Sequence, residues 1–101
     1  MKLLIITAIK LFEKEVKQFL KKSEIKTFSY TDIKGFRDSS EESVERNWFA
    51  SEMNESQSLM IYAFAKEENT ETLFKYVNEF NETQKTVSKI HVVILNVEKS
   101  N

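Results

Sequence analysis

Near its start the chain reads Lys2-Leu3-Leu4-Ile5-Ile6-Thr7-Ala8-Ile9, a run in which almost every side chain is apolar. Successive side chains of a β-strand point to opposite faces of its sheet. As a strand, residues 2–9 would place leucine and isoleucine on both faces, so neither face is suited to water. The run is too short to cross a bilayer, and we expect no direct insertion into a membrane.

Two later segments share this property. Residues 57–65 read Gln-Ser-Leu-Met-Ile-Tyr-Ala-Phe-Ala and residues 90–97 read Ile-His-Val-Val-Ile-Leu-Asn-Val, with apolar side chains on both alternating sets. We predict the third and fourth strands here. The second strand is predicted at residues 25–36, which are β-branched and aromatic but more polar. Such polarity is typical of a strand at the edge of a sheet.

Helical periodicity separates these strands in two places. Apolar residues within 11–22 and within 71–82 recur at the spacing of one helical face, and Asn69 or Thr70 would cap the second helix. The predicted order is βαββαβ, in which right-handed crossovers place both helices on the same side of the sheet. We therefore predict one α+β domain over residues 1–101, a ferredoxin-like sandwich with an antiparallel four-stranded sheet and two helices on one face.

The other face of this sheet would present large apolar side chains to water, each worth roughly 1.5 to 3 kcal/mol when buried. A soluble monomer rarely exposes such a patch. We predict that copies of the chain pack sheet on sheet in a closed homo-oligomer, and we favour a trimer. In the alternative, another part of the same chain, such as the long connection after the second strand, folds back over the open face.

That connection, residues 37–56, has no strand pattern and is longer than most connections in compact domains, which is typical of functional loops. Capping-box spacing in Ser39-Ser40-Glu41-Glu42 suggests a short helix over residues 40–47. Trp48 and Phe49 are large aromatic residues in a polar segment. They would anchor either the loop on its own oligomer or a partner protein.

Composition excludes several kinds of partner. Fifteen basic and sixteen acidic side chains give a net charge of −1, which offers no long-range attraction to nucleic acid. The third strand also lacks the glycine and the basic residue of RNA-recognition modules with the same element order. The chain has no cysteine, so we expect a reducing, cytoplasmic location and no thiolate metal site.

The sequence contains no pattern typical of catalysis. Ferredoxin-like acyl-phosphate hydrolases hold an anion in a loop with an arginine after the first strand, whereas this junction reads Ile9-Lys10-Leu11. No nucleophile is paired with a base, and we expect no enzyme activity. A single histidine among apolar neighbours, here His91, is more often packed or hydrogen-bonded than bound to a metal, so no metal ligands are predicted.

Several short motifs resemble those of the P-II signal-transduction superfamily. Residues 8–12, Ala-Ile-Lys-Leu-Phe, are similar to its Ile-Lys-Pro-Phe segment, and residues 32–36, Asp-Ile-Lys-Gly-Phe, to its Val-Lys-Gly-Phe-Gly. Residues 89–92, Lys-Ile-His-Val, resemble the Lys-Ile-Phe-Val that begins its last strand, and residues 96–98, Asn-Val-Glu, its Pro-Val-Glu. The resemblance implies a trimer whose sheets line the centre, adenine nucleotide in clefts between subunits, and a docking loop after the second strand.

The resemblance also implies where these sites would lie. An effector would bind near Lys34, Gly35, Phe36 and Lys89. Residues 37–56 would dock onto a membrane transporter or an enzyme, with Arg37, Trp48, Phe49 and Glu52 toward the partner. The family's glycine-containing phosphate loop corresponds here to residues 84–89, which contain no glycine, and the C-terminal arginines of the family and its modifiable loop tyrosine are absent. Nucleotide recognition should therefore be weakened or changed, and the sequence does not determine whether ATP, ADP or AMP binds.

The leading hypothesis is a P-II-like trimeric regulator that binds a small anionic effector at subunit clefts and presents or retracts its loop in response. An alternative from a different class is a trimeric metal-tolerance or ion-binding protein of the CutA-like kind, which shares the fold and would use carboxylates and His91. A third is an accessory subunit without a small ligand.

Overall fold

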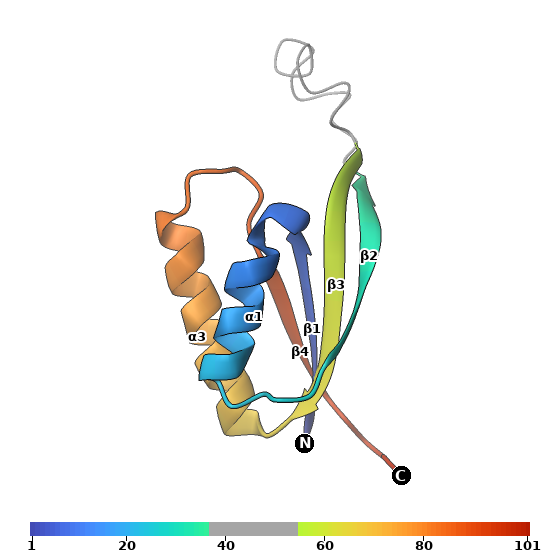
Figure 1. Ribbon diagram of the computed structural model, residues 1–101. Coiled ribbons are helices and arrows are strands. Elements are labelled where there is room, and N and C mark those ends of the chain that lie inside the picture. Colours follow the sequence, from blue (N-terminus) through green and yellow to red (C-terminus); the bar gives the residue numbers. More distant parts are fainter. Residues whose placement is uncertain (37–54) are drawn as a thin grey trace.

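The computed structural model describes residues 1–36 and 55–101, which form one sheet and a layer of helices (Figure 1). Along the chain the elements are β1 (Lys2–Ile9), the 3-10 turn η1 (Lys10–Phe12), α1 (Glu13–Lys22), β2 (Ser29–Phe36), β3 (Glu55–Ala65), α3 (Glu67–Thr83) and β4 (His91–Asn96). Neither described α-helix is long and apolar enough to span a membrane.

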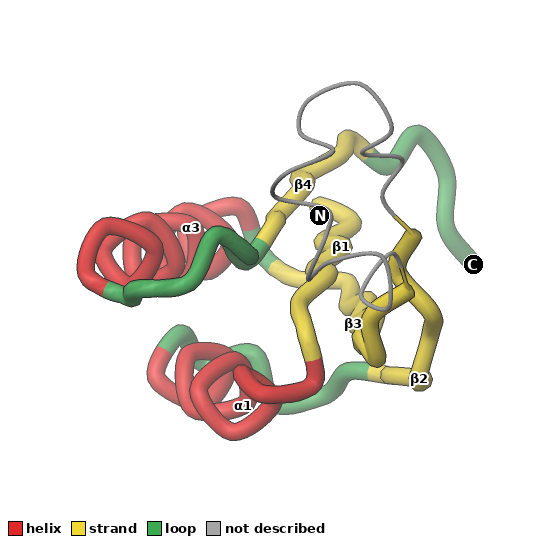
Figure 2. The backbone as a smooth tube through the Cα atoms, turned by 90° about the horizontal axis from the view of Figure 1, so that it is seen from above, coloured by secondary structure: helices red, strands yellow, loops and turns green. Residues whose placement is uncertain are grey.

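The four strands form one antiparallel sheet in the order β2-β3-β1-β4. Viewed from above, α1 and α3 lie on the same side of that sheet (Figure 2). The predicted ferredoxin-like sandwich is therefore confirmed. The more polar β2 is an edge strand, as its composition predicts, and the apolar β1 and β3 are the two central strands.

The core lies between the sheet and the two helices. Ile6 of β1 pairs with Ile61 of β3, and both side chains are completely buried. The helices contribute Val16, Leu20, Leu73 and Val77 to the same cluster. Rings of the helical layer also meet, since the Phe12 and Phe80 centroids are 5.1 Å apart in an edge-to-face arrangement, a geometry that aromatic quadrupoles favour.

The opposite face of the sheet is apolar and is not covered by any described helix. One row across it pairs Phe64, Leu3 and Leu95, and the next pairs Tyr62, Ile5 and Val93. Phe64 is 52% exposed and Tyr62 43% exposed. We call this surface the open face; its apolar members include Leu3, Ile5, Met60, Tyr62, Phe64, Val93 and Leu95. The prediction that neither face of the central strands is polar is confirmed.

The predicted start of the second strand, at Ile25, is wrong by four residues, because β2 begins at Ser29. Residues 23–28 instead close α1 and lead to the sheet. The Ile25 amide donates to the Leu20 carbonyl at 3.0 Å, and Glu24 takes the left-handed conformation, with a φ of 62°, that commonly ends a helix. The Ile25 side chain is buried in the core, so its apolar character reflects packing and not a strand.

The start of the second long helix differs as well. Lys66, in an extended conformation, precedes α3, which begins at Glu67, and the hydroxyl of Thr70 donates to the Glu67 carbonyl at 2.7 Å from inside the helix. Neither Asn69 nor Thr70 is therefore the N-terminal cap. Glu67 and Glu68 occupy the first turn, where carboxylates interact favourably with the helix dipole.

Smaller differences concern other boundaries. The first helix starts with the 3-10 turn η1, so the α-helix begins at Glu13 rather than at Leu11. The ladder with β2 extends β3 back to Glu55, two residues into the predicted loop 37–56. The last strand loses one residue at each end of its predicted range 90–97. The short helix predicted over residues 40–47 lies outside the described residues.

Candidate functional site

Three of the predicted effector residues lie at the end of β2 from which the chain continues into residue 37. Lys34 is exposed, and Phe36 is 71% exposed although it is the last residue of the strand. Gly35 pairs with Ser56 in the regular ladder and has no positive φ. No turn or bulge therefore requires a glycine at position 35. The absence of a side chain leaves the backbone of β2 uncovered at this position.

Lys89, the fourth predicted effector residue, lies just before β4. Its ammonium group donates to the Asn81 carbonyl at 2.8 Å, near the C-terminal end of α3, where the helix dipole favours a cation. The Asn81 side chain fixes the same junction, since its amide donates to the Ile90 carbonyl and its oxygen accepts from the Ile90 amide, both at 2.9 Å. In this arrangement Lys89 ties the end of α3 to the start of β4.

Within one chain these four residues are not brought together. β2 and β4 are opposite edges of the sheet, with β3 and β1 between them, and three strand spacings amount to roughly 14 Å. The end of β2 and the start of β4 do lie at the same end of the sheet (Figure 1). A ligand that contacts Lys34 and Lys89 together would need a second copy of the chain to bring the two edges near each other.

The connection between α3 and β4, residues 84–90, is closed by its own side chains. The Thr86 amide donates to the Gln84 side-chain oxygen at 2.7 Å, and the Ser88 amide donates to the Thr86 hydroxyl at 3.1 Å. The Thr86 hydroxyl also donates to Gln84. A phosphate-binding loop needs amides that point at the ligand, and these two are already used. The amides of Thr86 and Ser88 therefore do not form a phosphate cradle at this position.

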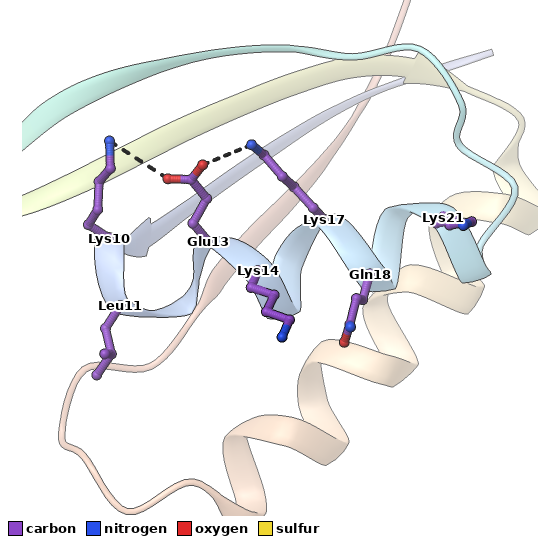
Figure 3. Close-up of a pocket in the computed structure, with 7 residues that line it drawn as sticks. All are labelled: Lys10, Leu11, Glu13, Lys14, Lys17, Gln18 and Lys21. Atoms are coloured by element: carbon purple, nitrogen blue, oxygen red, sulfur yellow. Dashed lines mark hydrogen bonds and ion pairs between the residues drawn. The ribbon is translucent and has the colours of Figure 1, made fainter.

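A further surface feature lies on the outer side of the first helix. A shallow groove of about 590 Å³ there is lined by Lys10, Leu11, Glu13, Lys14, Lys17, Gln18 and Lys21 (Figure 3). We call it the lysine groove. Its four lysines follow the spacing i, i+4, i+7 and i+11, with Lys10 in the turn η1 and the other three in α1. The sequence contains this spacing, but the apolar periodicity of residues 11–22 does not by itself indicate a binding surface there.

An ion-pair network fastens this helix to the edge strand β2. Lys10 pairs with Asp32 of β2 and with Glu13 at 3.7 Å, while Lys17 pairs with Glu13 at 2.8 Å. The Lys17 ammonium also lies 4.2 Å from the centre of the Tyr30 ring, a second contact with β2. Figure 3 shows Lys10 and Lys17 both turned toward the Glu13 carboxylate.

The network shifts the ionisation of its members. The hydrogen bond from Lys17, followed by the charges of Lys17 and Lys10, lowers the pKa of Glu13 below its ordinary value of 4.5. The hydrogen bond to Asp32 raises the pKa of Lys10, and that to Glu13 raises the pKa of Lys17, above 10.5. The carboxylate thus stabilises the fold above its unfolded-state pKa and the ammonium groups below theirs. All charges of the network are therefore present between the unfolded-state pKa of glutamate and that of lysine.

Replacement of Glu13 by glutamine is expected to lower the melting temperature slightly at pH 7, because the pairs with Lys10 and Lys17 are exposed and lose only their charge. The deficit should shrink as the pH falls through the lowered pKa of Glu13, where the parent protein also loses the carboxylate. Thermal unfolding followed by circular dichroism between pH 3 and pH 7 measures this difference. A deficit that stays constant over the whole range would contradict a role for the Glu13 charge.

The predicted partner residues Arg37, Trp48, Phe49 and Glu52 lie outside the described residues. No group of three or more histidine, aspartate or glutamate side chains that could hold a metal occurs in residues 1–36 and 55–101. His91 is exposed and pairs with Thr7 on the open face. The alternative of an ion-binding protein therefore has no ligand cluster within the described part of a single chain.

Four antiparallel strands in this order, with both helices on one face, define the ferredoxin-like class. Two solved structures share the architecture over nearly the whole chain. One is named a PII-like signalling protein, from Thermus thermophilus, with 21% identity, a TM-score of 0.59 and coverage of 95% of this chain and 85% of that chain.

The other is CPII, a nitrogen regulatory PII-like protein from Thiomonas intermedia, solved with ADP, AMP and bicarbonate. It has 16% identity and a TM-score of 0.60, and the match covers 97% of this chain and 94% of that chain. No protein-family model matches the sequence, and no curated protein matches it. The chain has the fold of PII-like proteins, so the resemblance seen in its motifs is confirmed at the level of fold.

Proposed function

We propose that this protein is a PII-like regulator that works as a homotrimer, binds a small anionic effector at clefts between subunits, and docks a partner protein through residues 37–54 in response. The observation that carries the proposal is the open face, an apolar surface across β3, β1 and β4 that no described element covers. The likeness of the chain in fold to two proteins named as PII-like supports the same interpretation.

The open face favours association because its rows are continuous across three strands. Leu3, Ile5 and their partners on β3 and β4 form an apolar surface that is only half-buried in the single chain. Burial of a large apolar side chain contributes roughly 1.5 to 3 kcal/mol, and closed symmetry lets identical surfaces shield one another. Sheets packed around a common axis would leave the helices outside.

Association would also complete the effector site. One copy offers Lys34, Gly35 and Phe36 at its β2 edge, and a neighbouring copy would offer Lys89 beside its β4 edge. Lys34 is exposed and forms no ion pair with another described residue, so its charge is available to an anion. Lys89 would have to leave the Asn81 carbonyl or bind through its remaining donors, since an ammonium group carries three.

Adenine nucleotides are the effector class to test, because CPII was solved with ADP and AMP. The closed connection at residues 84–90 offers no phosphate cradle from the amides of Thr86 and Ser88. We therefore expect the affinity to depend little on the number of phosphates. In the proposed site the lysines supply charge, and no row of backbone amides follows the phosphate chain.

Isothermal titration calorimetry with AMP, ADP and ATP is expected to give dissociation constants within about tenfold of one another, a difference of about 1.4 kcal/mol. Lys34→Ala should weaken all three to a similar extent, whereas Lys99→Ala, far along the chain in the exposed C-terminal segment, should have no effect. Absence of heat with all three nucleotides would remove the adenine effector, and a preference for ATP well beyond tenfold would show a phosphate cradle after all.

Regulation requires that the effector bind two states of the docking segment with different affinity, because a ligand with equal affinity for both shifts nothing. In the proposal these states differ in whether Arg37, Trp48, Phe49 and Glu52 are presented to the partner, a membrane transporter or an enzyme. Phe36 links the effector site to this segment directly, since it ends β2 and is largely exposed.

A further inference from the structure

The lysine groove is a positively charged surface on a protein whose net charge is −1. Three of its four lysines, Lys14, Lys17 and Lys21, extend along about 10 Å of α1. Lys10 and Lys17 are engaged with Asp32 and Glu13. Lys14 and Lys21, in contrast, form no ion pair within residues 1–36 and 55–101, and both are exposed. Two positive charges therefore remain available on this surface.

Lys14 and Lys21 are seven residues apart, so they lie two turns, or about 10 Å, from each other along the same side of the helix. Figure 3 shows Lys14 and Gln18 on the side of the helix away from Lys10 and Lys17. Leu11, which is 70% exposed, lies at one end of the groove. The groove thus offers spaced cations, an amide and an apolar contact on consecutive turns.

The neighbouring helix has the opposite charge. The exposed residues of α3 include five charged ones that recur at the spacing of one helical side, Glu68, Glu71, Lys75, Glu79 and Glu82. The helical layer is consequently basic on α1 and acidic on α3. A negatively charged partner is attracted by α1 and repelled by α3, and this repulsion restricts where it can bind.

We propose that the lysine groove docks an acidic segment of a partner polypeptide, with Lys14 and Lys21 as the main contacts. The inference rests on the proposed function only in that a regulated partner exists, and it places the contact on α1, which contains neither the effector residues nor the proposed docking segment. Charge complementarity selects the partner, since carboxylates at helical spacing match the spacing of the two available lysines.

Shape favours a polypeptide over other anions. The groove is shallow and its lysines point in different directions, so a small anion would contact one or two of them at most. A nucleic acid duplex, with a phosphate charge about every 1.7 Å of its axis, would extend beyond the groove toward the glutamates of α3. A short acidic helix or strand can lie along α1 alone.

Such docking would affect the edge strand β2 through Lys10 and Lys17. Carboxylates of the partner compete with Glu13 and Asp32 for Lys10 and Lys17, the two lysines that fasten α1 to β2. Because β2 leads directly to residue 37, a partner on the groove would loosen the strand that carries the proposed effector residues.

The test uses the full chain and a fluorescein-labelled peptide that carries pairs of glutamates seven residues apart, with fluorescence anisotropy as the readout. Lys14→Glu combined with Lys21→Glu is expected to raise the dissociation constant about tenfold or more, because two attractions become repulsions. Lys85→Glu combined with Lys99→Glu makes the same change in net charge outside the groove and should alter the affinity by no more than about twofold. Binding should also weaken as the salt concentration rises.

Equal losses in the two double variants would overturn the inference, since binding would then follow net charge. Inorganic tripolyphosphate that binds through Lys14 and Lys21 while the peptide does not would overturn it in favour of a phosphate ligand. Salt-sensitive self-association that the groove variant abolishes would overturn it by assigning the groove to α3 of a second copy. Nucleotide calorimetry on the groove variant keeps this question apart from the proposed function, because Lys14 and Lys21 are not effector residues.

Discussion

Ile5→Lys is expected to separate the protein into single folded chains. Ile5 lies at the middle of β1, between Tyr62 and Val93 in the central row of the open face. A lysine there places a charge in the proposed contact between sheets, and an unpaired buried charge costs several kcal/mol. Its neighbours on the other face, Leu4 and Ile6, keep their core contacts, so the fold should survive the substitution.

Sedimentation velocity measures the dissociation, and far-ultraviolet circular dichroism shows whether the variant remains folded. Asn78→Lys is the matched control, since it adds the same charge to an exposed position of α3 on the opposite side of the molecule. A folded Ile5→Lys variant with the same mass as the parent protein would show that the open face is not the contact between copies.

Ile61→Ala is expected to destabilise the protein by about 2 to 5 kcal/mol, and Ile61→Val by about 0.5 to 1.5 kcal/mol. Ile61 is completely buried on β3, paired with Ile6 of β1 and Tyr30 of β2 on the helix side of the sheet. Its truncation leaves a cavity that the surrounding layer fills only in part.

Urea denaturation of the three proteins at one fixed concentration gives these differences, because the stability of an oligomer depends on protomer concentration. A loss below about 1 kcal/mol for Ile61→Ala would mean that the core is loosely packed around this position. The effect should appear in the Ile5→Lys background as well, since Ile61 faces the helices and not the neighbouring copies.

The strands and their arrangement could be predicted because buried strands require apolar side chains at known spacings in the sequence. In β1 and β3 the side chains on both faces are apolar, a pattern that is typical of a sheet buried on both faces. The start of α3 could not be predicted because Glu67 and Glu68 carry no hydrophobic periodicity; the helix dipole, not core packing, favours them there. Ile25 is predicted in a strand because it is apolar. An apolar side chain can equally well enter the core from a connection between elements, as that of Ile25 does.

The candidate site was less predictable. Lys89 is identified by motif resemblance, but its bond to Asn81 depends on how the end of α3 meets β4, which no local pattern reveals. The same holds for Thr86 and Ser88, whose amides are used within their own loop. The lysine groove, in contrast, is visible as helical spacing in the sequence, because Lys14 and Lys21 need only an ordinary helix to align.

The contact of open faces between identical copies is tested most directly by the mass of the unmodified protein in solution. Light scattering coupled to size exclusion, at micromolar concentration and physiological salt, is expected to give three times the 11.9 kDa of one chain. A mass that stays near 11.9 kDa as the concentration rises would contradict it, and the clefts proposed between subunits would then not exist.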